Sequence, residues 1–308
     1  NDDNILKKFD LPKGSMQLVD NVKSDIIKIQ TADFKRILSS GGSAANTIHG
    51  LAMTGIEAGY IGSTGADELG DFFENDMRKA GVKTCIIRRE SSTGTAVALI
   101  SPDSERTFAT HLGAAIELEA GDLTPGQFDG YDILYLEGYL IINRPLVERA
   151  CQLAKEKNME IAIDMASYNV VEARLDDFTE IVEKYADIVF ANEDEARAFT
   201  SSYPEEALQK ISCLCDIAVV KVGSEGSWIK RGEEMIKVDA SPVKLKDTTG
   251  AGDLYAAGFL YGYAHGESLD KCGLYGSILA GHVIEIVGAR MNDDRWIMAK
   301  KSLFSDQV

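Results

Sequence analysis

The chain has 308 residues, 45% hydrophobic and 26% charged, which are values of a globular protein long enough for one large α/β domain. Its formal net charge of −17 disfavours nucleic acid and anionic membranes as partners, although backbone amides can still bind a phosphate locally. Five scattered cysteines predict reduced structural thiols, and the absence of a leader-like start or an 18-residue apolar run predicts a cytoplasmic protein with no membrane segment.

The first 40 residues are mixed and polar, with short apolar pieces at 16–19 and 26–29. From Gly41 on we expect a helix, a strand and a second helix, the two helices being closed by Gly55 and Gly81. Three short strands are expected next, at 85–90, 94–100 and 106–111. These hairpin-like strands predict a small antiparallel subdomain beside the main sheet.

Beyond residue 130, apolar strands alternate with helices. The expected strands are 132–138, 160–166, 186–192 and 217–223. The expected helices are 144–158, 252–265 and 270–286. This alternation is typical of βαβ units, and therefore of a parallel sheet with both faces covered. In the last helix but one, Gly258 and Gly262 lie four apart and predict close packing of that helix against the sheet.

The segment from Asp247 to Asp253 reads DTTGAGD and leads directly into an apolar helix. Gly250, Ala251 and Gly252 would present backbone N–H groups to an anion at the positive end of that helix. Asp253, in the first helical turn, can accept a proton from an attacking hydroxyl, and phosphoryl transfer needs this pairing. The alternative is that both acids are ordinary helix caps, and the spacing alone leaves the two interpretations open.

Motifs of other enzyme classes are missing from the sequence. The P-loop pattern GxxxxGK[ST] and the dinucleotide pattern GxGxxG are absent, so neither a Walker ATPase nor a standard dinucleotide fold is indicated. The hydrolase patterns HExxH and GxSxG are absent as well.

Three motifs together resemble those of the ribokinase-like, or PfkB, carbohydrate kinase family. DTTGAGD resembles its C-terminal signature, GGSAANTIHGLA at 41–52 its N-terminal signature, and NEDE at 192–195 its NxxE motif. They stand in the family's order, and the resemblance extends over about 41–288. GGSAAN, FDLPKGSMQLVD and TGTAVALISPDSERTFATHLGAA are most similar to the adenosine-kinase-like branch.

The resemblance implies a ribokinase-like three-layer α/β fold, with a mostly parallel central sheet flanked by helices and a small antiparallel β lid. It implies one kinase domain over 1–308, with lid strands within 12–32 and 84–114. Members of the family usually begin with a core strand whose Asp grips sugar hydroxyls. Because residues 1–11 show no such strand, we expect it to be missing from this chain.

The family's chemistry implies roles for the residues of the two outer signatures. Asp253 would be the base on a substrate hydroxyl, and the amides of 250–252 would hold the γ-phosphate. Gly42 and Asn46 would contact substrate hydroxyls. The lid would close over the substrate and exclude water.

Asn192 and Glu195 would organise Mg²⁺ through water, because hard oxygen ligands suit that ion. Without the resemblance, the same segment is a solvated acidic helix start. Asp247 and Thr249, with the loop 287–291, would hold K⁺.

The segment KVGSEGS, which begins at Lys221, resembles the family's nucleotide loop. Gly223 and Gly226 would let the backbone approach ATP there, and a plain β-turn is the alternative. Lys221 and Thr248 are further expected ATP contacts.

The expected activity is ATP-dependent transfer of the γ-phosphate to a hydroxymethyl group of a sugar or nucleoside, with adenosine or a related ribosyl compound as the first candidate. Fructose or ribose as acceptor, a pyridoxal- or hydroxymethylpyrimidine-type kinase, and a non-catalytic sugar- or nucleoside-sensing protein on the same fold remain alternatives. The expected ligands are ATP, Mg²⁺, K⁺ and one small molecule. Both a monomer and a homodimer stay open.

Overall fold

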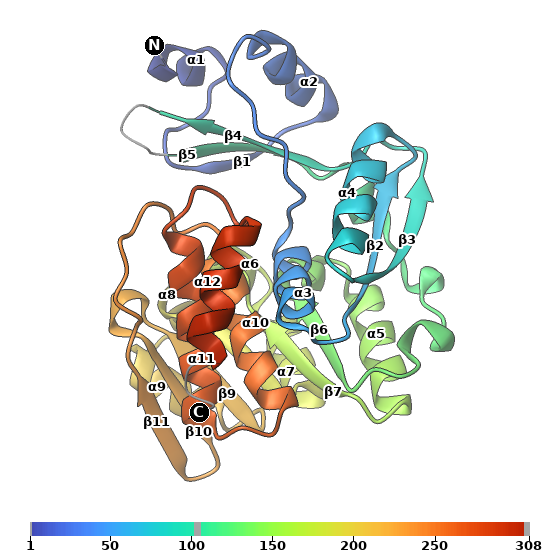
Figure 1. The fold of residues 1–308 in the computed structure, drawn as a ribbon. Coiled ribbons are helices and arrows are strands. Elements are labelled where there is room, and N and C mark those ends of the chain that lie inside the picture. The colour runs from blue at the N-terminus through green and yellow to red at the C-terminus, as the bar shows by residue number, and fades with distance from the viewer. Residues whose placement is uncertain (1, 102–105, 305–308) are drawn as a thin grey trace. The chain divides into compact units, whose positions relative to one another are not determined.

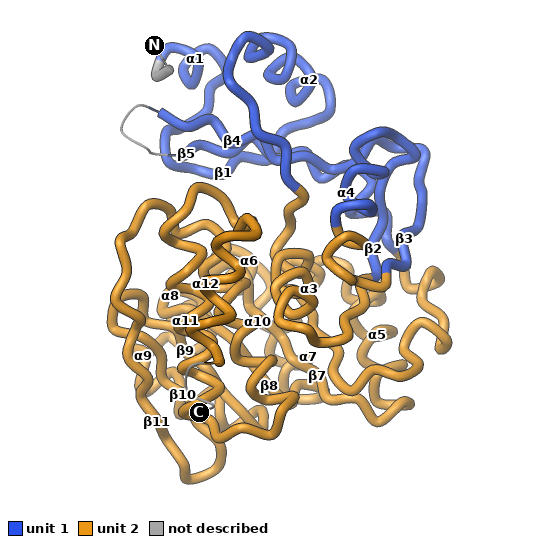
Figure 2. Tube along the Cα trace, in the orientation of Figure 1, with its two compact units in different colours: residues 1–39, 61–76, 84–118 blue, residues 40–60, 77–83, 119–308 orange. Residues whose placement is uncertain are grey.

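The computed structural model describes residues 2–101 and 106–304 (Figure 1). The chain divides into two compact units, drawn in different colours in Figure 2. Unit 1 comprises residues 1–39, 61–76 and 84–118, and unit 2 comprises residues 40–60, 77–83 and 119–308. Within the described ranges, none of the helices has the length and apolar character that crossing a membrane requires.

Unit 2 is built on a six-stranded sheet of order β11-β10-β9-β8-β7-β6. Its strands are β6 (Ile133–Glu137), β7 (Glu160–Asp164), β8 (Ile188–Asn192), β9 (Ile217–Lys221), β10 (Ser227–Arg231) and β11 (Glu234–Val238). Strands β6 to β9 run parallel, whereas β10 and β11 are antiparallel to their neighbours. The four parallel strands confirm the mostly parallel sheet of the predicted ribokinase-like α/β fold.

Helices pack on both faces of this sheet (Figure 1). Strand residues such as Phe190 and Val219 share one large core with the helices of the first face, and Val189 and Val220 alternate to the other face. The first set is α3 (Ser43–Thr54), α10 (Ala251–Ala264), α11 (Leu269–Ile284) and α12 (Asp293–Phe304). The helices that accompany the strands on the other side are α5 (Arg144–Glu156), α6 (Tyr168–Ala173), α7 (Leu175–Tyr185), α8 (Glu193–Thr200) and α9 (Pro204–Ile211).

Helix α10 is apolar on all sides and is buried throughout Leu254–Gly262, as such a helix must be. Its glycines correct one expectation, because they approach a helix and not the sheet. A Cβ at Gly258 would overlap the backbone carbonyl of Tyr275 in α11, and one at Gly262 would lie 3.1 Å from the Cα of Cys272. The two glycines therefore allow the backbones of α10 and α11 to pack closely.

Unit 1 contains a three-stranded sheet of order β1-β5-β4. Its strands are β1 (Met16–Leu18), β4 (Thr95–Ile100) and β5 (Arg106–His111). Strands β4 and β5 are antiparallel as expected, but β1 pairs in parallel with β5. The sheet packs on α1 (Asp2–Lys8) and α2 (Asn21–Gln30) through a small core that includes Leu6, Ile27 and Ala109.

The strands of this sheet lie within both ranges expected for the lid, 12–32 and 84–114, and the role of a lid stays a prediction. Within 12–32 only β1 is a strand, since Asp20 caps α2 by accepting from the Lys23 backbone N–H at 2.7 Å. Within 84–114, β3 (Lys83–Arg89) pairs with β2 (Gly59–Gly65) and not with β4.

The remaining elements are short or fall close to where they were expected. Helix α4 (Glu68–Lys79) ends before Gly81, whose φ of 91° is left-handed. Short 3-10 helices occupy Gly113–Glu117, Ala120–Asp122, Pro125–Phe128, Gly138–Ile142 and Gly223–Glu225.

Candidate active site

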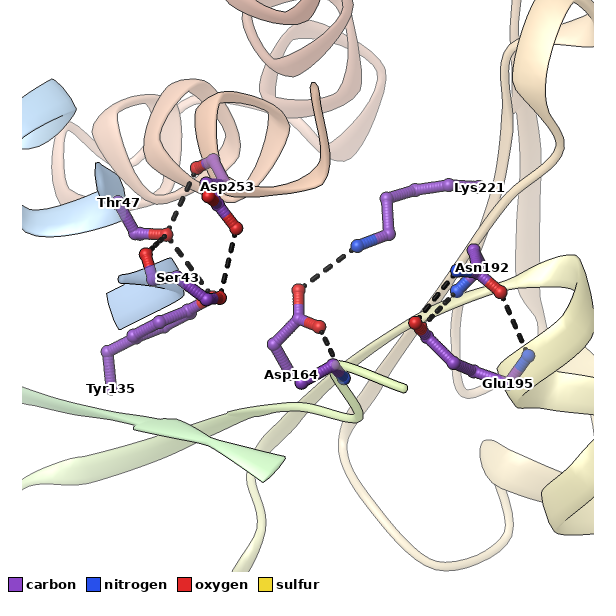
Figure 3. Close-up of polar contacts among 9 residues, drawn as sticks. Ser43, Thr47, Tyr135, Asp164, Asn192, Glu195, Lys221 and Asp253 are labelled. Carbon is purple, nitrogen blue, oxygen red and sulfur yellow. Dashed lines mark hydrogen bonds and ion pairs between the residues drawn. The ribbon is translucent and has the colours of Figure 1, made fainter. Parts of the chain in front are cut away.

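Four neighbouring parallel strands of unit 2 each end on a polar residue. These last residues are Glu137 of β6, Asp164 of β7, Asn192 of β8 and Lys221 of β9. Because the carboxyl ends of parallel strands meet at one edge of a sheet, the four side chains line the edge where open α/β sheets bind ligands. Figure 3 shows three of them together with Asp253 of α10.

The glycine turn ahead of α10 is formed as the sequence predicts. Gly250 is the N-cap of the helix with a left-handed φ of 79°, and a Cβ there would come within 2.6 Å of the Ala289 side chain. The first N–H groups of a helix have no partner within it. One of them, that of Ala251, donates to the Thr248 carbonyl at 3.1 Å.

Asp253 faces α3 across the start of α10. Its carboxylate accepts from the Ser43 hydroxyl at 2.9 Å and from the Asn46 side-chain amide at 2.8 Å. The hydroxyl of Thr47 donates to the Asp253 carbonyl at 3.2 Å (Figure 3). The structure thus brings the N-terminal and C-terminal signatures together, and the helix cap is Gly250 while both Asp253 oxygens point to α3.

Burial raises the pKa of the Asp253 carboxyl to about 6, a shift that the Asn46 amide opposes and the charge of Asp164 reinforces. Ser43 and Lys221 lower the same pKa. A carboxylate with a pKa close to neutral is well matched to accept a proton under physiological conditions.

Glu137 is a site residue that sequence reasoning missed. Its carboxylate accepts from the backbone N–H of Ala44, at the start of α3, at 2.7 Å. Burial raises the pKa of Glu137 to about 7, and the charges of Asp253 and Asp164 add to that rise. The available signal was an acidic residue that ends an apolar strand next to other strands of the same kind.

Gly42 and Asn46 lie where α3 begins. Gly42 is its N-cap, with a φ of 103° that favours glycine. Asn46 is only 6% exposed, and its side-chain oxygen is buried without a hydrogen-bond partner among the residues that the structure describes. A buried amide oxygen with no partner is costly, and a donor on a bound molecule would satisfy it.

Of the residues expected to bind ATP, Lys221 lies in the site and forms an ion pair with Asp164 at 3.0 Å. Gly223 and Gly226 form the turn between β9 and β10, both with positive φ. A Cβ at Gly226 would overlap the Val238 carbonyl, so close packing of the backbone by itself accounts for a glycine at this position. Thr248 is exposed. Nucleotide contacts for these residues remain predictions.

Asn192 and Glu195 form a reciprocal capping box at the start of α8. The backbone and side-chain amides of Asn192 donate to the Glu195 carboxylate at 2.8 and 2.7 Å. Glu195 is only 4% exposed, so the solvated interpretation fails for this residue. Burial raises its pKa to about 7, against the opposing charge of Lys221.

The donor set fits a hydrated Mg²⁺ better than a closed metal cage. Across residues 2–101 and 106–304, no three or more His, Cys, Asp and Glu side chains gather in a metal-binding cluster. Mg²⁺ usually keeps several waters and takes one or two carboxylates. Glu195, next to Asn192, offers one such carboxylate. This ion's site remains a prediction.

Asp247 joins the turn to the loop that follows α11. Its carboxylate accepts from the Thr249 hydroxyl at 2.8 Å and from the Gly288 backbone N–H at 2.6 Å. Asp247, Thr249 and the expected 287–291 loop are thus adjacent, and K⁺ binding there remains a prediction.

Comparison with known proteins agrees with this geometry. The pfkB family carbohydrate kinases match residues 16–295. An uncharacterized sugar kinase of Archaeoglobus fulgidus is 33% identical over 247 residues, 78% of this chain and 96% of the relative. A 5-dehydro-2-deoxygluconokinase of Bacillus subtilis is 29% identical over 261 residues, 79% of this chain and 80% of the relative.

Among solved structures, the adenosine kinase from Sinorhizobium meliloti superposes with a TM-score of 0.88 at 33% identity. That superposition covers 98% of this chain and 94% of the other. Motif, fold and sequence similarity agree over most of the length. The chain therefore belongs to the pfkB family of carbohydrate kinases, and it is a phosphotransferase that acts on an alcohol group.

Proposed function

We propose that this protein transfers the γ-phosphate of ATP to a hydroxymethyl group of a sugar or nucleoside, with Asp253 as the base. The observation that carries the proposal is the position of Asp253. Its carboxylate lies in the first turn of α10, next to the 250–252 amides, and accepts hydrogen bonds from Ser43 and Asn46.

In this mechanism the acceptor hydroxyl binds between α3 and the start of α10. Gly42 and Asn46 orient the acceptor, and the buried Asn46 oxygen takes a hydrogen bond from one of its hydroxyls. Asp253 accepts the proton of the attacking hydroxyl, whose oxygen forms the new bond to phosphorus. The bond from phosphorus to the bridging oxygen breaks, and its electron pair leaves with ADP.

Backbone N–H groups at residues 250–252 stabilise the charge of the phosphoryl group in transit, helped by the positive end of α10. Gly223, Gly226 and Thr248 flank the nucleotide, and Asn192 and Glu195 hold the water shell of Mg²⁺. When bound, Mg²⁺ neutralises phosphate charge. Asp247 and Thr249 hold K⁺ next to the turn.

Adenosine or a related ribosyl compound is the first candidate acceptor. The support is the similarity to the Sinorhizobium meliloti adenosine kinase over nearly the whole chain. Relatives with comparable identity carry the names sugar kinase and 5-dehydro-2-deoxygluconokinase, so a sugar acceptor is the second candidate. Formation of ADP from Mg-ATP should therefore be measured with adenosine, other nucleosides, ribose, fructose and 5-dehydro-2-deoxygluconate.

The variant Asp253→Asn tests the proposed base. It keeps the shape of the side chain but cannot accept the proton, so we expect kcat to fall by about 10²- to 10⁴-fold while the acceptor still binds. Turnover and calorimetric binding of the best acceptor are the two measurements.

Asp270→Asn is the matched control, because Asp270 is an exposed acid in the first turn of another helix, α11. It should retain the activity of the wild type. Unchanged turnover in Asp253→Asn would remove Asp253 as the base. Binding without turnover by the wild type, across the whole panel, would instead favour a sensing protein.

A further inference from the structure

Of the four polar residues that end the parallel strands at the site, Lys221 is the one with a positive charge. It forms an ion pair with a neighbouring acid. Its ammonium lies 3.0 Å from one oxygen of Asp164, and the two side chains are 14% and 6% exposed. The other Asp164 oxygen accepts from the Ala166 backbone N–H at 2.9 Å. Ala166 has a φ of 61°, which is uncommon for a residue with a side chain. The backbone therefore turns sharply after β7, and this turn brings the Ala166 N–H to the Asp164 carboxylate.

The ammonium of Lys221 also lies next to the glycine turn. A Cβ at Gly252 would come within 3.2 Å of the Lys221 nitrogen. Gly252 is in the first turn of α10, where the helix carries partial positive charge. A cation at this end of a helix is unfavourable by itself, and both positive features favour an anion between them. In Figure 3 the Lys221 side chain extends toward the space between Asp253 and Asp164.

The charge on Lys221 persists despite burial. Burial lowers the pKa of the ammonium, but the charges of Asp164 and Glu195 outweigh it and raise the pKa above its ordinary value. A buried lysine that keeps its charge beside the positive end of a helix is well placed to bind the negative charge of a phosphoryl group.

We propose that Lys221 is a catalytic residue that contacts the phosphoryl group in transit, and that Asp164 is the positioning residue that holds its ammonium beside the 250–252 turn. This inference rests on the proposed function and deepens it. The pair takes no proton and forms no covalent bond. The proton still goes to Asp253 and the leaving electron pair to ADP, while Lys221 lowers the energy of the charge on the phosphoryl oxygens.

The test compares Lys221→Met, Asp164→Asn and the double variant with the wild type. Lys221→Met should lower kcat by about 10²- to 10³-fold, as loss of one oxyanion donor does, with the acceptor KM changed little. Asp164→Asn leaves the cation present but less well placed, so a fall of roughly 10-fold or more is expected.

The double variant keeps the test valid if Lys221→Met unfolds, because it leaves no unpaired buried charge. If Asp164 acts through Lys221, the double variant should lose no more than Lys221→Met alone. The matched control removes an exposed ion pair of the same unit, that of Lys83 and Glu57 at 2.8 Å, as K83M with E57Q. A double variant within about threefold of this control in kcat overturns the proposal.

The pH profile separates positioning from a merely structural role. Asp253 is faced by the charges of Asp164, Glu137 and Lys221, and by the phenols of two tyrosines of the same site. These are Tyr135 and Tyr139.

Loss of the Asp164 charge lowers the pKa of Asp253, whereas loss of the Lys221 charge raises it. The acid limb of kcat/KM should therefore move to lower pH in Asp164→Asn and to higher pH in Lys221→Met. Limbs that stay in place in both variants count against the proposal.

A binding measurement distinguishes failure of the Lys221 proposal from failure of the proposed kinase reaction, whatever the acceptor is. Tripolyphosphate with Mg²⁺ presents phosphoryl charge without a nucleoside. We expect it to raise the melting temperature of the wild type and the exposed-pair control, and to bind the double variant about 10-fold more weakly or worse. Equal stabilisation of all three overturns the role of Lys221. Tripolyphosphate binding that depends on Lys221, in a wild type that phosphorylates nothing, would overturn the proposed reaction but keep the anion site.

Discussion

Glu137 shows what a single buried acid costs this fold. Its carboxylate is fixed by the Ala44 N–H, yet burial and the neighbouring charges of Asp253 and Asp164 disfavour its ionised form. The ordinary pKa is 4.5 and the pKa in the fold is about 7. Between these values the folded state keeps a proton that the unfolded state releases. The stability that the fold gains by keeping Glu137 protonated is therefore fully present below pH 4.5 and is lost as the pH rises through 7.

We predict that Glu137→Gln stabilises the protein at pH 8 by up to roughly 3 kcal/mol, because each pKa unit corresponds to about 1.4 kcal/mol and glutamine has no charge to bury. Its side-chain oxygen can still accept from Ala44. Urea unfolding at pH 8 and pH 5 measures the effect, which should be several times smaller at pH 5, because that pH lies only just above the ordinary pKa of 4.5. Glu156→Gln, at an exposed position near the end of α5, should show no such pH dependence. A gain that is equal at both pH values would contradict burial of the Glu137 charge as its cause.

The signatures predicted some site residues and were silent on others. Asp253, Asn46 and the 250–252 turn follow from contiguous motifs whose spacing carries the chemistry. Glu137 and Asp164 stand in strands that share no local pattern with those motifs, and only the order of the sheet brings them to the same edge. The sequence does show that Glu137 and Asp164 each end an apolar strand. In a parallel sheet such strand ends lie at one edge, and this pattern would have predicted that the two acids share the site.

Helix α10 connects the fold to the site. Its first turn carries Gly250 and Asp253, while the rest of the helix is buried against α3 and α11. Close packing with α11 depends on Gly258, because its missing side chain admits the Tyr275 carbonyl. The position of Asp253 therefore depends on a contact more than one helical turn away.

We predict that Gly258→Ala lowers the free energy of unfolding by about 1–3 kcal/mol, the usual cost of overfilling a packed core. Helix propensity alone would favour alanine by about 1 kcal/mol, so a net loss identifies the packing. Urea denaturation measures the loss. Gly121→Ala is the control, since Gly121 is exposed and a Cβ there has open space among the described residues. A Gly258→Ala variant as stable as the wild type would show that α10 and α11 can move apart at little cost.

Elements with strong periodicity and clear stops were predicted well. The helix of 43–54 and the four parallel strands lie within a few residues of their expected bounds, because Gly55 and the apolar runs define them locally. The β10–β11 hairpin was missed because the apolar residues of its sequence, SWIKRGEEMIKV, stand in pairs between charged residues and do not alternate with polar ones. Helix α2 was missed although Val22, Ile26 and Ile29 follow the helical period. These three side chains are exposed, so α2 lacks the buried apolar face by which a helix is usually predicted.

At the scale of the whole molecule, the two units differ greatly in their cores. The cluster of unit 2 joins six strands and four helices through fully buried residues such as Phe190 and Phe259. Among the residues that the structure describes, the unit 1 cluster has six buried members, including Phe9 and Ile27. Because local stability follows buried apolar contact, we expect backbone amides of unit 1 to exchange with solvent faster than those of β7 to β9.

The variant Ile27→Ala tests whether the small core supports unit 1 independently. Ile27 is fully buried in α2, and truncation of such a side chain costs about 2–5 kcal/mol. Hydrogen exchange should speed up across α2, β4 and β5, while β7 to β9 keep the protection of the wild type. Ile29→Ala, on the same helix but 72% exposed, is the matched control and should leave exchange unchanged. Equal loss of protection in β7 to β9 would mean that the two cores unfold as one cooperative unit, since a defect confined to unit 1 lowers protection elsewhere only if both units open together.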